Sequence, residues 1–218
     1  MRKYLLFDLD GTLLDTITDL WLSVNHALSC FALPTHSIEA VMRMVGNGIR
    51  SLVARAVPSG EDDPKFDAVF AEFRRHYELH KNDHTAPYDG IHEMLRALMA
   101  VGYVPAVVSN KIDSAVKGLC RETFPDTVAY ALGDTEGVPR KPAPDMVYAA
   151  LRALGAEPSD AYFIGDSEVD VVTARNAGLP CLSVLWGFRK REELLAVGGN
   201  TFFETPAELA AYLLNEAK

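Results

Sequence analysis

The chain has 218 residues, of which 49% are hydrophobic and 23% are charged, so it can form a well-packed core and is too apolar for a disordered chain. Its formal net charge of -9 argues against nonspecific binding to nucleic acid or to an anionic membrane. The N-terminal apolar run is too short for a secretion signal. The three cysteines are too far apart in sequence to suggest disulfides or a zinc site. We therefore expect a cytoplasmic protein.

The first predicted element is a buried strand at residues 3–8 (KYLLFD), followed by a helix for which Thr16 is a candidate N-cap. Residues 16–82 form a helical block, and its clearest helix covers residues 64–80, where aromatic and apolar residues recur at helical spacing. Residues 81–90 (KNDHTAPYDG) are polar, contain proline and glycine, and are typical of a linker.

From residue 91 onward, the predicted helices and strands alternate. Helices are predicted at 91–101, 113–122, 144–155, 169–177 and 206–216, and strands at 103–109, 127–132, 161–165, 180–186 and 201–203. Such alternation predicts a parallel sheet with helices on both faces, and the first strand must join it because a single strand could not be buried. We predict an α/β core domain of residues 1–15 and 83–218, with a helical cap domain of residues 16–82 inserted after the first strand.

Polar residues stand where several of these strands end. They are Asp8 and Asp10 after the first strand, Ser109 and Asn110 at the end of the strand 103–109, and Asp166 after the strand 161–165. Asp170 follows Asp166 by one helical turn, and Lys141 lies in a loop, GVPRKPAP, that can reach the same edge. Because open parallel sheets bind ligands beyond the carboxyl ends of their strands, we expect these side chains to form one site.

The residue types of this predicted site favour phosphate chemistry. Clustered carboxylates without histidine or cysteine are typical ligands of a hard cation such as Mg²⁺, which also offsets their mutual repulsion. A lysine, a serine hydroxyl and a cation together form a phosphate site. An aspartate within reach of the phosphate can attack phosphorus and form an acyl-phosphate, while a second aspartate transfers the proton.

Four segments, in this order, resemble the motifs of the haloacid dehalogenase superfamily of phosphohydrolases. They are DLDGTLLDT (8–16), Ser109, Lys141 in RKPAPD, and GDSEVD (165–170). The resemblance implies a Rossmannoid three-layer core with a parallel sheet and a cap inserted after the first strand. It also implies that Asp8 is the nucleophile and a Mg²⁺ ligand.

The resemblance implies roles for the other residues of the site. Asp10 would be the general acid and base, with its backbone carbonyl on the metal, and Thr12 would help to orient it. Asp166 would bind the metal directly, and Asp170 would support the metal site. The phosphoryl group would be held mainly by Ser109 and Lys141, with further contacts from Gly11, Thr12 and Asn110.

Within the superfamily, the chain is most similar to the phosphoglycolate phosphatase group. The segments VGNGIRSLVARA (45–56), PYDG (87–90) and VVSNK (107–111) carry this resemblance. It implies 2-phosphoglycolate as the substrate, with Arg50 and the turn Gly46-Asn47-Gly48 as candidate substrate contacts. We expect Mg²⁺ as the cofactor, a small phosphorylated metabolite as the ligand, no nucleic-acid or membrane partner, and a monomer or homodimer.

Other functions stay open on the sequence. A mutase like β-phosphoglucomutase shares the motifs, and so does a phosphatase for pyrophosphate, a nucleotide or a sugar phosphate. A non-catalytic module that senses phosphate is a further alternative, although this chain keeps every catalytic group. Dehalogenation is disfavoured because it needs neither Mg²⁺ nor an acid at position 10. The segment HYELH (76–80) lacks the glutamate spacing of zinc proteases, so it is not a predicted metal site.

Overall fold

A computed structural model of the chain describes residues 2–217. The chain forms two compact units, one that runs to Leu13 and resumes at Pro87, and one from Leu14 to Ala86. The sequence analysis placed these boundaries after residues 15 and 82. The passages between the units coincide with β2 (Leu14–Asp15) and β3 (Ala86–Pro87), which pair as a short two-stranded sheet.

The first unit, here called the core, contains a six-stranded sheet. Its strands are β1 (Tyr4–Phe7), β4 (Val104–Ile112), β5 (Tyr130–Asp134), β6 (Ala161–Gly165), β7 (Cys181–Val184) and β8 (Phe202–Phe203). Their order is β5-β4-β1-β6-β7-β8, and neighbouring strands pair in parallel. Strand β1 lies inside the sheet, where Leu5, Leu6 and Phe7 are fully buried, as expected for an apolar strand covered on both faces. The predicted α/β fold with a parallel sheet is confirmed.

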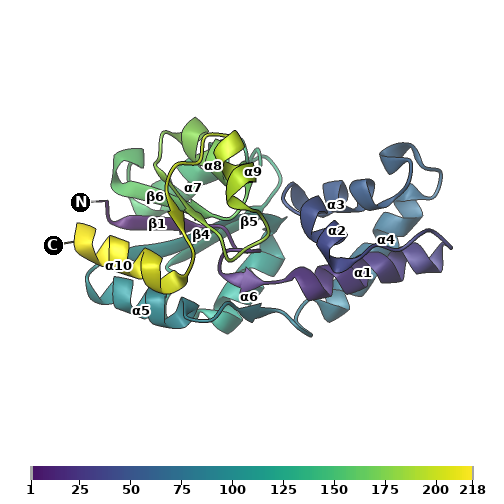
Figure 1. Cartoon of the computed structure of the whole chain (residues 1–218), viewed down its shortest axis with the longest axis horizontal. Coiled ribbons are helices and arrows are strands. Elements are labelled where there is room, and N and C mark those ends of the chain that lie inside the picture. Colours follow the sequence, from purple (N-terminus) through teal and green to yellow (C-terminus); the bar gives the residue numbers. More distant parts are fainter. Residues whose placement is uncertain (1, 218) are drawn as a thin grey trace. The chain divides into compact units, whose positions relative to one another are not determined.

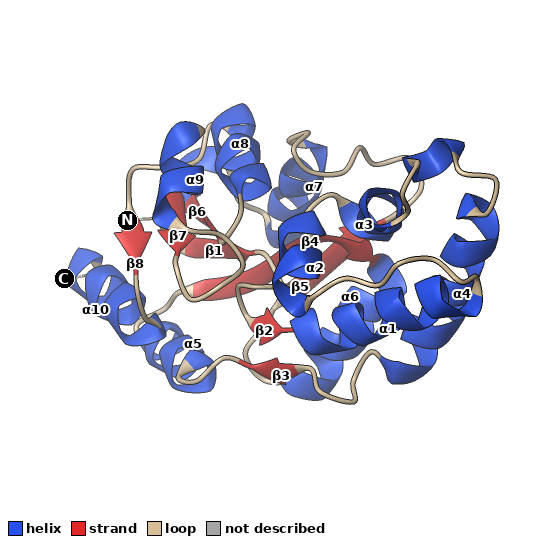
Figure 2. Ribbon diagram, turned by 45° about the vertical axis from the view of Figure 1, so that its right-hand side comes forward, coloured by secondary structure: helices blue, strands red, loops and turns tan. Residues whose placement is uncertain are grey.

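Helices cover both faces of this sheet (Figures 1 and 2). They are α5 (Ile91–Ala100), α6 (Asp113–Thr123), α7 (Asp145–Leu154), α8 (Glu168–Ala177), α9 (Arg191–Ala196) and α10 (Pro206–Glu216). Helices α5, α6 and α10 lie on one side and α7, α8 and α9 on the other. Met146 and Ala150 of α7 and Ala174 of α8 pack with Leu6 and Phe163 of the sheet, so this layer is one continuous apolar core.

Two strands differ by three residues at one end from their predicted bounds. Strand β4 runs to Ile112 instead of ending at residue 109, and its register with β5 shifts between Val108 and Ile112. Such a bulge re-aims side chains, so residues 109–111 leave the regular alternation of the strand at the edge where ligands bind. Strand β5 begins at Tyr130 instead of residue 127. Pro105 lies near the start of β4, where a missing N–H is tolerated.

The second unit, here called the cap, is helical. It contains α1 (Ile17–Cys30), α2 (Ile38–Met44), α3 (Gly48–Ala56), a short 3-10 helix (Gly60–Asp62) and α4 (Phe66–His80). Thr16 is the N-cap residue of α1, as predicted, but its side chain makes no capping hydrogen bond; instead the Asp15 carboxylate accepts the N–H of Ile17 at 3.2 Å. Buried Asp19 accepts the backbone N–H groups of His84 and Thr85 at 2.9–3.0 Å, which ties the start of α1 to the end of the cap.

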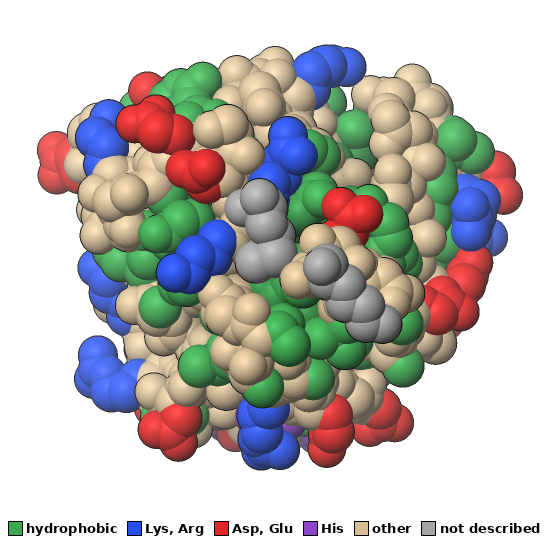
Figure 3. Space-filling model, turned by 90° about the vertical axis from the view of Figure 1, so that its left-hand side faces the viewer, with side chains coloured by type: hydrophobic (Ala, Val, Ile, Leu, Met, Phe, Trp, Pro, Cys, Tyr) green, Lys and Arg blue, Asp and Glu red, His purple; other side chains and the backbone are tan. Residues whose placement is uncertain are grey.

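Within residues 2–217, no helix combines the length and the apolar character that crossing a bilayer requires. On the face of the core shown in Figure 3, lysine and arginine side chains are scattered among aspartate and glutamate. Basic side chains are therefore not gathered on this face in the way that favours a polyanion.

Candidate active site

Asp8 is fixed where β1 leaves the sheet. Its N–H donates to the carbonyl of Ile164 at 2.9 Å, so the pairing with β6 continues one residue past the end of β1. Its Oδ1 accepts the N–H of Leu9 at 2.7 Å and lies 3.0 Å from Nζ of Lys141. The side chain is 13% exposed, so it is shielded on most sides and still accessible to a small molecule.

Lys141 joins two carboxylates at the centre of the site. Its Nζ lies 3.0 Å from Oδ1 of Asp8 and 2.8 Å from Oδ1 of Asp170, and its side chain is 1% exposed. The amide of Asn110 donates to the backbone carbonyl of Lys141 at 2.9 Å. Asn110, which the resemblance assigned to phosphate binding, thus also holds the loop that carries the lysine.

Asp166 follows β6 directly and is held by two donors. Its Oδ1 accepts the hydroxyl of Thr12 at 3.0 Å, and its Oδ2 accepts the N–H of Phe188 at 2.8 Å. The family resemblance implied that Thr12 helps to orient Asp10. In the structure the Thr12 hydroxyl donates to Asp166 instead. The two bonds leave the carboxylate little freedom to rotate, which is how protein sites orient a metal ligand.

Asp170 lies in the first turn of α8 and is fully buried. Its Oδ2 accepts the N–H of Ser167 at 3.1 Å and the Ser167 hydroxyl at 2.6 Å. Ser167 and Asp170 form a capping box, so the start of the helix fixes the carboxylate. Oxygen atoms of Asp8, Asp166 and Asp170 lie within 4.8 Å of one another, and this acidic group could hold a metal ion.

Two glycines let the loops of the site approach closely. Gly11 has a φ of +83°, and a Cβ there would lie 2.4 Å from Oδ2 of Asp166. A Cβ on Gly187 would lie 2.2 Å from the carbonyl oxygen of Gly11 and 2.4 Å from Cβ of Asp166. Trp186, beside Gly187, donates its indole N–H to the carbonyl of Thr12 at 2.9 Å. Residues 186–188 thus support the site from the loop that follows β7, which the sequence did not predict.

The buried carboxylates of the site are not fully compensated by positive charge, and the pKa values of Asp8 and Asp166 reflect this. Burial, together with Asp170 and Asp10, raises the pKa of Asp8 to about 7, although Lys141 opposes this. Burial, together with Asp170 and Asp8, raises the pKa of Asp166 to about 8. Burial alone would lower the pKa of Lys141, but Asp170 and Asp8 outweigh it, so that pKa is raised and the lysine stays charged. A bound cation would oppose both effects, because its charge favours the ionised carboxylates and lowers their pKa values.

Asp10 has a lysine partner of its own. Nζ of Lys111 donates to Oδ1 of Asp10 at 2.9 Å; the lysine side chain is 3% exposed and the aspartate 16%. Ser109 is buried, and its hydroxyl oxygen accepts the N–H of Lys111 at 3.4 Å. Lys111 was part of the segment VVSNK but received no role from the sequence. Its position at the end of a central strand was the available signal.

Arg50 and the turn at residues 46–48 belong to the cap. Nη2 of Arg50 lies 2.7 Å from Oε2 of Glu61, and the guanidinium lies 4.8 Å from the centre of the Phe66 ring. Both partners of this ion pair are about half exposed, so it is weak and can exchange. The role of Arg50 in substrate binding stays a prediction.

Comparison with known proteins places this arrangement in a family. A family model described as haloacid dehalogenase-like hydrolase matches residues 5–184. This chain belongs to that family. Its curated relatives include the phosphoglycolate phosphatases of Pseudomonas syringae pv. tomato and Aquifex aeolicus, each 33% identical over 86% of this chain. The matches cover 71% and 87% of those two proteins. These relatives indicate that the chain is an enzyme of the phosphatase class.

Solved structures agree on the fold of the whole chain. A structure from Lactobacillus delbrueckii subsp. bulgaricus has a TM-score of 0.92 and 31% identity, and the match covers 97% of this chain and 98% of that one. A predicted phosphoglycolate phosphatase from Haemophilus somnus has a TM-score of 0.88 and 29% identity over 96% and 97% of the two chains. The family fold that the sequence motifs implied is confirmed.

Proposed function

We propose that this chain is a Mg²⁺-dependent phosphatase that hydrolyses a small phosphate monoester, with 2-phosphoglycolate as the leading candidate. The observation that carries the proposal is the position of Asp8. It is partly accessible, lies 3.0 Å from a buried lysine, and belongs to a group of three carboxylates. An aspartate so placed is a nucleophile for phosphorus, and the lysine stabilises the charge that develops on the transferred oxygens.

The donor set of the site fits Mg²⁺. Asp8, Asp166 and Asp170 offer oxygen atoms only, which Mg²⁺ prefers. The raised pKa values of Asp8 and Asp166 reflect carboxylates that a divalent ion would stabilise in the charged form. Asp8 and Asp166 would hold the ion together with the carbonyl of Asp10, and Asp170 would support the site through Lys141 and Ser167. When bound, the ion would supply charge neutralisation to the phosphoryl group.

In this proposal an oxygen of Asp8 attacks phosphorus. A new P–O bond forms on Asp8 while the bond from phosphorus to the leaving oxygen breaks, and Asp10 gives its proton to that oxygen. Water then attacks the aspartyl-phosphate, Asp10 takes the proton from the water, and inorganic phosphate leaves with Asp8 restored. Lys141 holds the phosphoryl oxygens in both steps, and Lys111 holds the Asp10 carboxylate in place.

The substrate assignment is supported by the names of the relatives and by the small size that a buried nucleophile requires. Relatives at 30–33% identity that cover most of this chain are phosphoglycolate phosphatases. A mutase or a phosphatase for another metabolite would use the same core residues, so the substrate has to be measured.

The deciding experiment is a phosphate-release screen with purified protein and Mg²⁺ over 2-phosphoglycolate, pyrophosphate, nucleoside monophosphates and sugar phosphates. We expect the highest kcat/KM with 2-phosphoglycolate. Asp8→Asn should abolish release while the thermal unfolding transition persists, and Asp126→Asn, an exposed aspartate on the core, is the matched control. Formation of a stable phosphate isomer would instead assign a mutase, and no release with any metal would leave a phosphate-binding module.

A further inference from the structure

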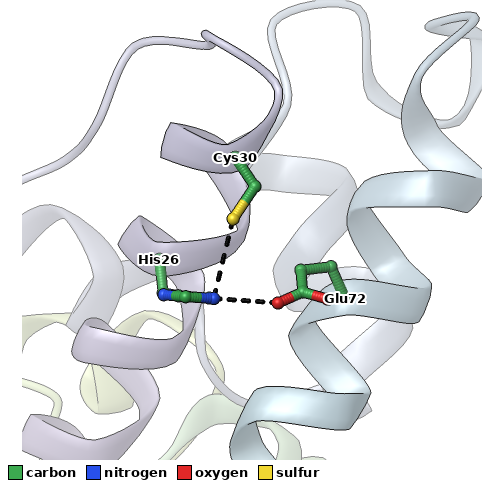
Figure 4. A group of neighbouring side chains, drawn as sticks. All are labelled: His26, Cys30 and Glu72. Atoms are coloured by element: carbon green, nitrogen blue, oxygen red, sulfur yellow. Dashed lines mark hydrogen bonds and ion pairs between the residues drawn. The ribbon is translucent and has the colours of Figure 1, made fainter.

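A second group of metal-ligating side chains lies in the cap. Figure 4 shows Nε2 of His26 directed at the sulfur of Cys30 and at the carboxylate of Glu72. His26 and Cys30 lie one turn apart on α1, and Glu72 comes from α4. Nε2 of His26 lies 3.6 Å from Sγ of Cys30 and 2.8 Å from Oε1 of Glu72. Among residues 2–217, this is one of two groups of three side chains that could hold a metal ion.

We propose that His26, Cys30 and Glu72 form a binding site for Zn²⁺ or a similar borderline transition-metal ion, separate from the acidic site of the core. The ligand types support this choice. A thiolate, an imidazole and a carboxylate are the usual protein ligands of Zn²⁺, whereas Mg²⁺ and Ca²⁺ prefer oxygen. Three protein ligands would leave one tetrahedral position for water.

The two distances from Nε2 of His26 to the other ligand atoms are close to those that a tetrahedral ion imposes. With Zn–S near ~2.3 Å and Zn–N near ~2.0–2.1 Å, the sulfur and the nitrogen of such a site lie about 3.6 Å apart. This is the 3.6 Å found between Cys30 and His26. The nitrogen and the carboxylate oxygen of a tetrahedral site lie about 3.3 Å apart. Glu72, now at 2.8 Å and in hydrogen-bond contact, has to move back only slightly.

Neighbouring side chains hold two of these ligands in place. The ring of His76 stacks on the ring of His26 with centroids 4.0 Å apart, and the Ser23 hydroxyl lies 3.0 Å from Nδ1 of His76. Arg75 contacts both carboxylate oxygens of Glu72, at 2.6 and 2.9 Å. Contacts of this kind hold the ligands of known zinc sites in the orientation that binds the metal. His76 belongs to the segment HYELH and supports the site instead of binding the ion.

The site is open to solvent, since Cys30 is exposed and the His26 side chain is 38% exposed. On binding, the Cys30 thiol loses its proton to solvent as the metal–sulfur bond forms. Nε2 of His26 exchanges its contact with Glu72 for the metal, and the proton that Nε2 donated to Glu72 moves through solvent to Nδ1 of the same ring. The ion then bridges α1 and α4. It would stabilise the cap by linking these two helices, because a ligand that binds only the folded state favours that state.

The test uses Co²⁺ as a spectroscopic substitute for Zn²⁺, with full-length protein and excess Mg²⁺ to occupy the carboxylates of the core. A thiolate bound to Co²⁺ gives a near-ultraviolet charge-transfer band, which carboxylates alone do not. We expect this band in the unmodified protein, its loss in Cys30→Ser, and its displacement by Zn²⁺. Cys181→Ser, which removes a thiol from the core, is the matched control and should keep the band. Absence of the band in the unmodified protein, or its persistence in Cys30→Ser, would overturn the proposal.

Calorimetry with Zn²⁺ under the same conditions gives a second readout. We expect His26→Gln, Cys30→Ser and Glu72→Gln each to weaken this binding by more than about 10-fold, since even outer contacts of zinc sites are worth about 10–100-fold. Zn²⁺ should raise the unfolding temperature of the unmodified protein but not of Cys30→Ser. A Zn²⁺ affinity in all three variants equal to that of the unmodified protein would show that the ion binds elsewhere. None of these readouts depends on phosphatase activity, so the two proposals can fail separately.

Discussion

The ammonium group of Lys141 lies 3.0 Å from Oδ1 of Asp8, and the lysine side chain is almost completely buried. A buried cation in contact with the proposed nucleophile offsets the cost of burying that carboxylate and meets the oxygens of an incoming phosphate. Nζ of Lys141 also lies 2.8 Å from Asp170, so one side chain connects the nucleophile Asp8 to Asp170. The loss of Lys141 should therefore affect both stability and catalysis.

We expect Lys141→Met to lower kcat for phosphate release by about 10²–10³-fold or more, because it removes a preorganised donor to the transferred oxygens. Lys141→Arg should not restore the rate, since a planar guanidinium does not fit the place of a compact ammonium. The control is Lys117→Met, which changes an exposed lysine on α6. A Lys141→Met enzyme with normal kcat would contradict the role of Lys141.

Lys111 should act through Asp10. Lys111→Met removes the contact at 2.9 Å and leaves the carboxylate free to rotate, so proton transfer to the leaving oxygen becomes less effective. Because general acid–base catalysis contributes about 10²–10⁴-fold, we expect kcat/KM with 2-phosphoglycolate to fall by about 10–100-fold. p-Nitrophenyl phosphate has a leaving group that needs no proton, so its kcat/KM, which does not include the later attack of water on the aspartyl-phosphate, should fall much less. Equal losses with both substrates would contradict a role through Asp10.

The contribution of Asp8 and Asp166 to the stability of the metal-free protein should fall as the pH rises from about 4 to 8. Folding raises their pKa values from 3.8 to about 7 and about 8, so in this range these two groups bind more protons in the folded state than in the unfolded chain. The contribution of the neutral carboxyls is fully present below pH 4 and is lost as the pH passes these values.

Asp166→Asn should weaken this dependence. In EDTA, the difference between the unfolding temperatures of Asp166→Asn and unmodified protein should shift in favour of the variant between pH 5 and pH 8.5. Mg²⁺ at pH 8.5 should stabilise the unmodified protein more than the variant. If the difference in unfolding temperature between Asp166→Asn and the unmodified protein does not change with pH, as expected for Asp126→Asn, then Asp166 is charged over this whole pH range.

Gly187→Ala should damage the fold and the site together. Its Cβ would lie 2.2 Å from a backbone oxygen of Gly11, and that backbone cannot move aside without displacing Asp166. We expect the free energy of unfolding to fall by about 1–3 kcal/mol, as for other overpacked sites, with a loss of Mg²⁺-dependent activity. Gly118→Ala on α6 is the control. Nothing lies within 4 Å of its added Cβ, so it should be neutral or stabilising by up to about 1 kcal/mol.

Arg50 can be separated from its ion pair by two matched variants. If Arg50 binds the carboxylate or phosphate of the substrate, Arg50→Gln should raise KM for 2-phosphoglycolate by about 10-fold or more, as expected for a lost charged hydrogen bond. Glu61→Gln breaks the same ion pair from the other side and should leave KM unchanged or lower. Equal KM values in both variants and the unmodified enzyme would remove Arg50 from the substrate site.

The sequence alone determined the fold class and most of the core site. Asp8, Ser109 and Asp166 stand at or near strand ends, and the carboxyl ends of parallel strands share one edge, so their convergence followed from local patterns and topology. The helical spacing of residues 64–80 similarly predicted α4, because its apolar face has to be buried.

Only the tertiary structure decided which side chains touch. The pairing of Lys111 with Asp10, the N–H of Phe188 on Asp166, and the meeting of His26 with Glu72 join residues 22 to 101 positions apart. No periodicity within one segment encodes such contacts, because they depend on bulges, tight loops and the packing of whole helices. The sequence pattern thus determined which residues lie at the ligand-binding edge of the sheet, and tertiary packing determined which side chains contact one another.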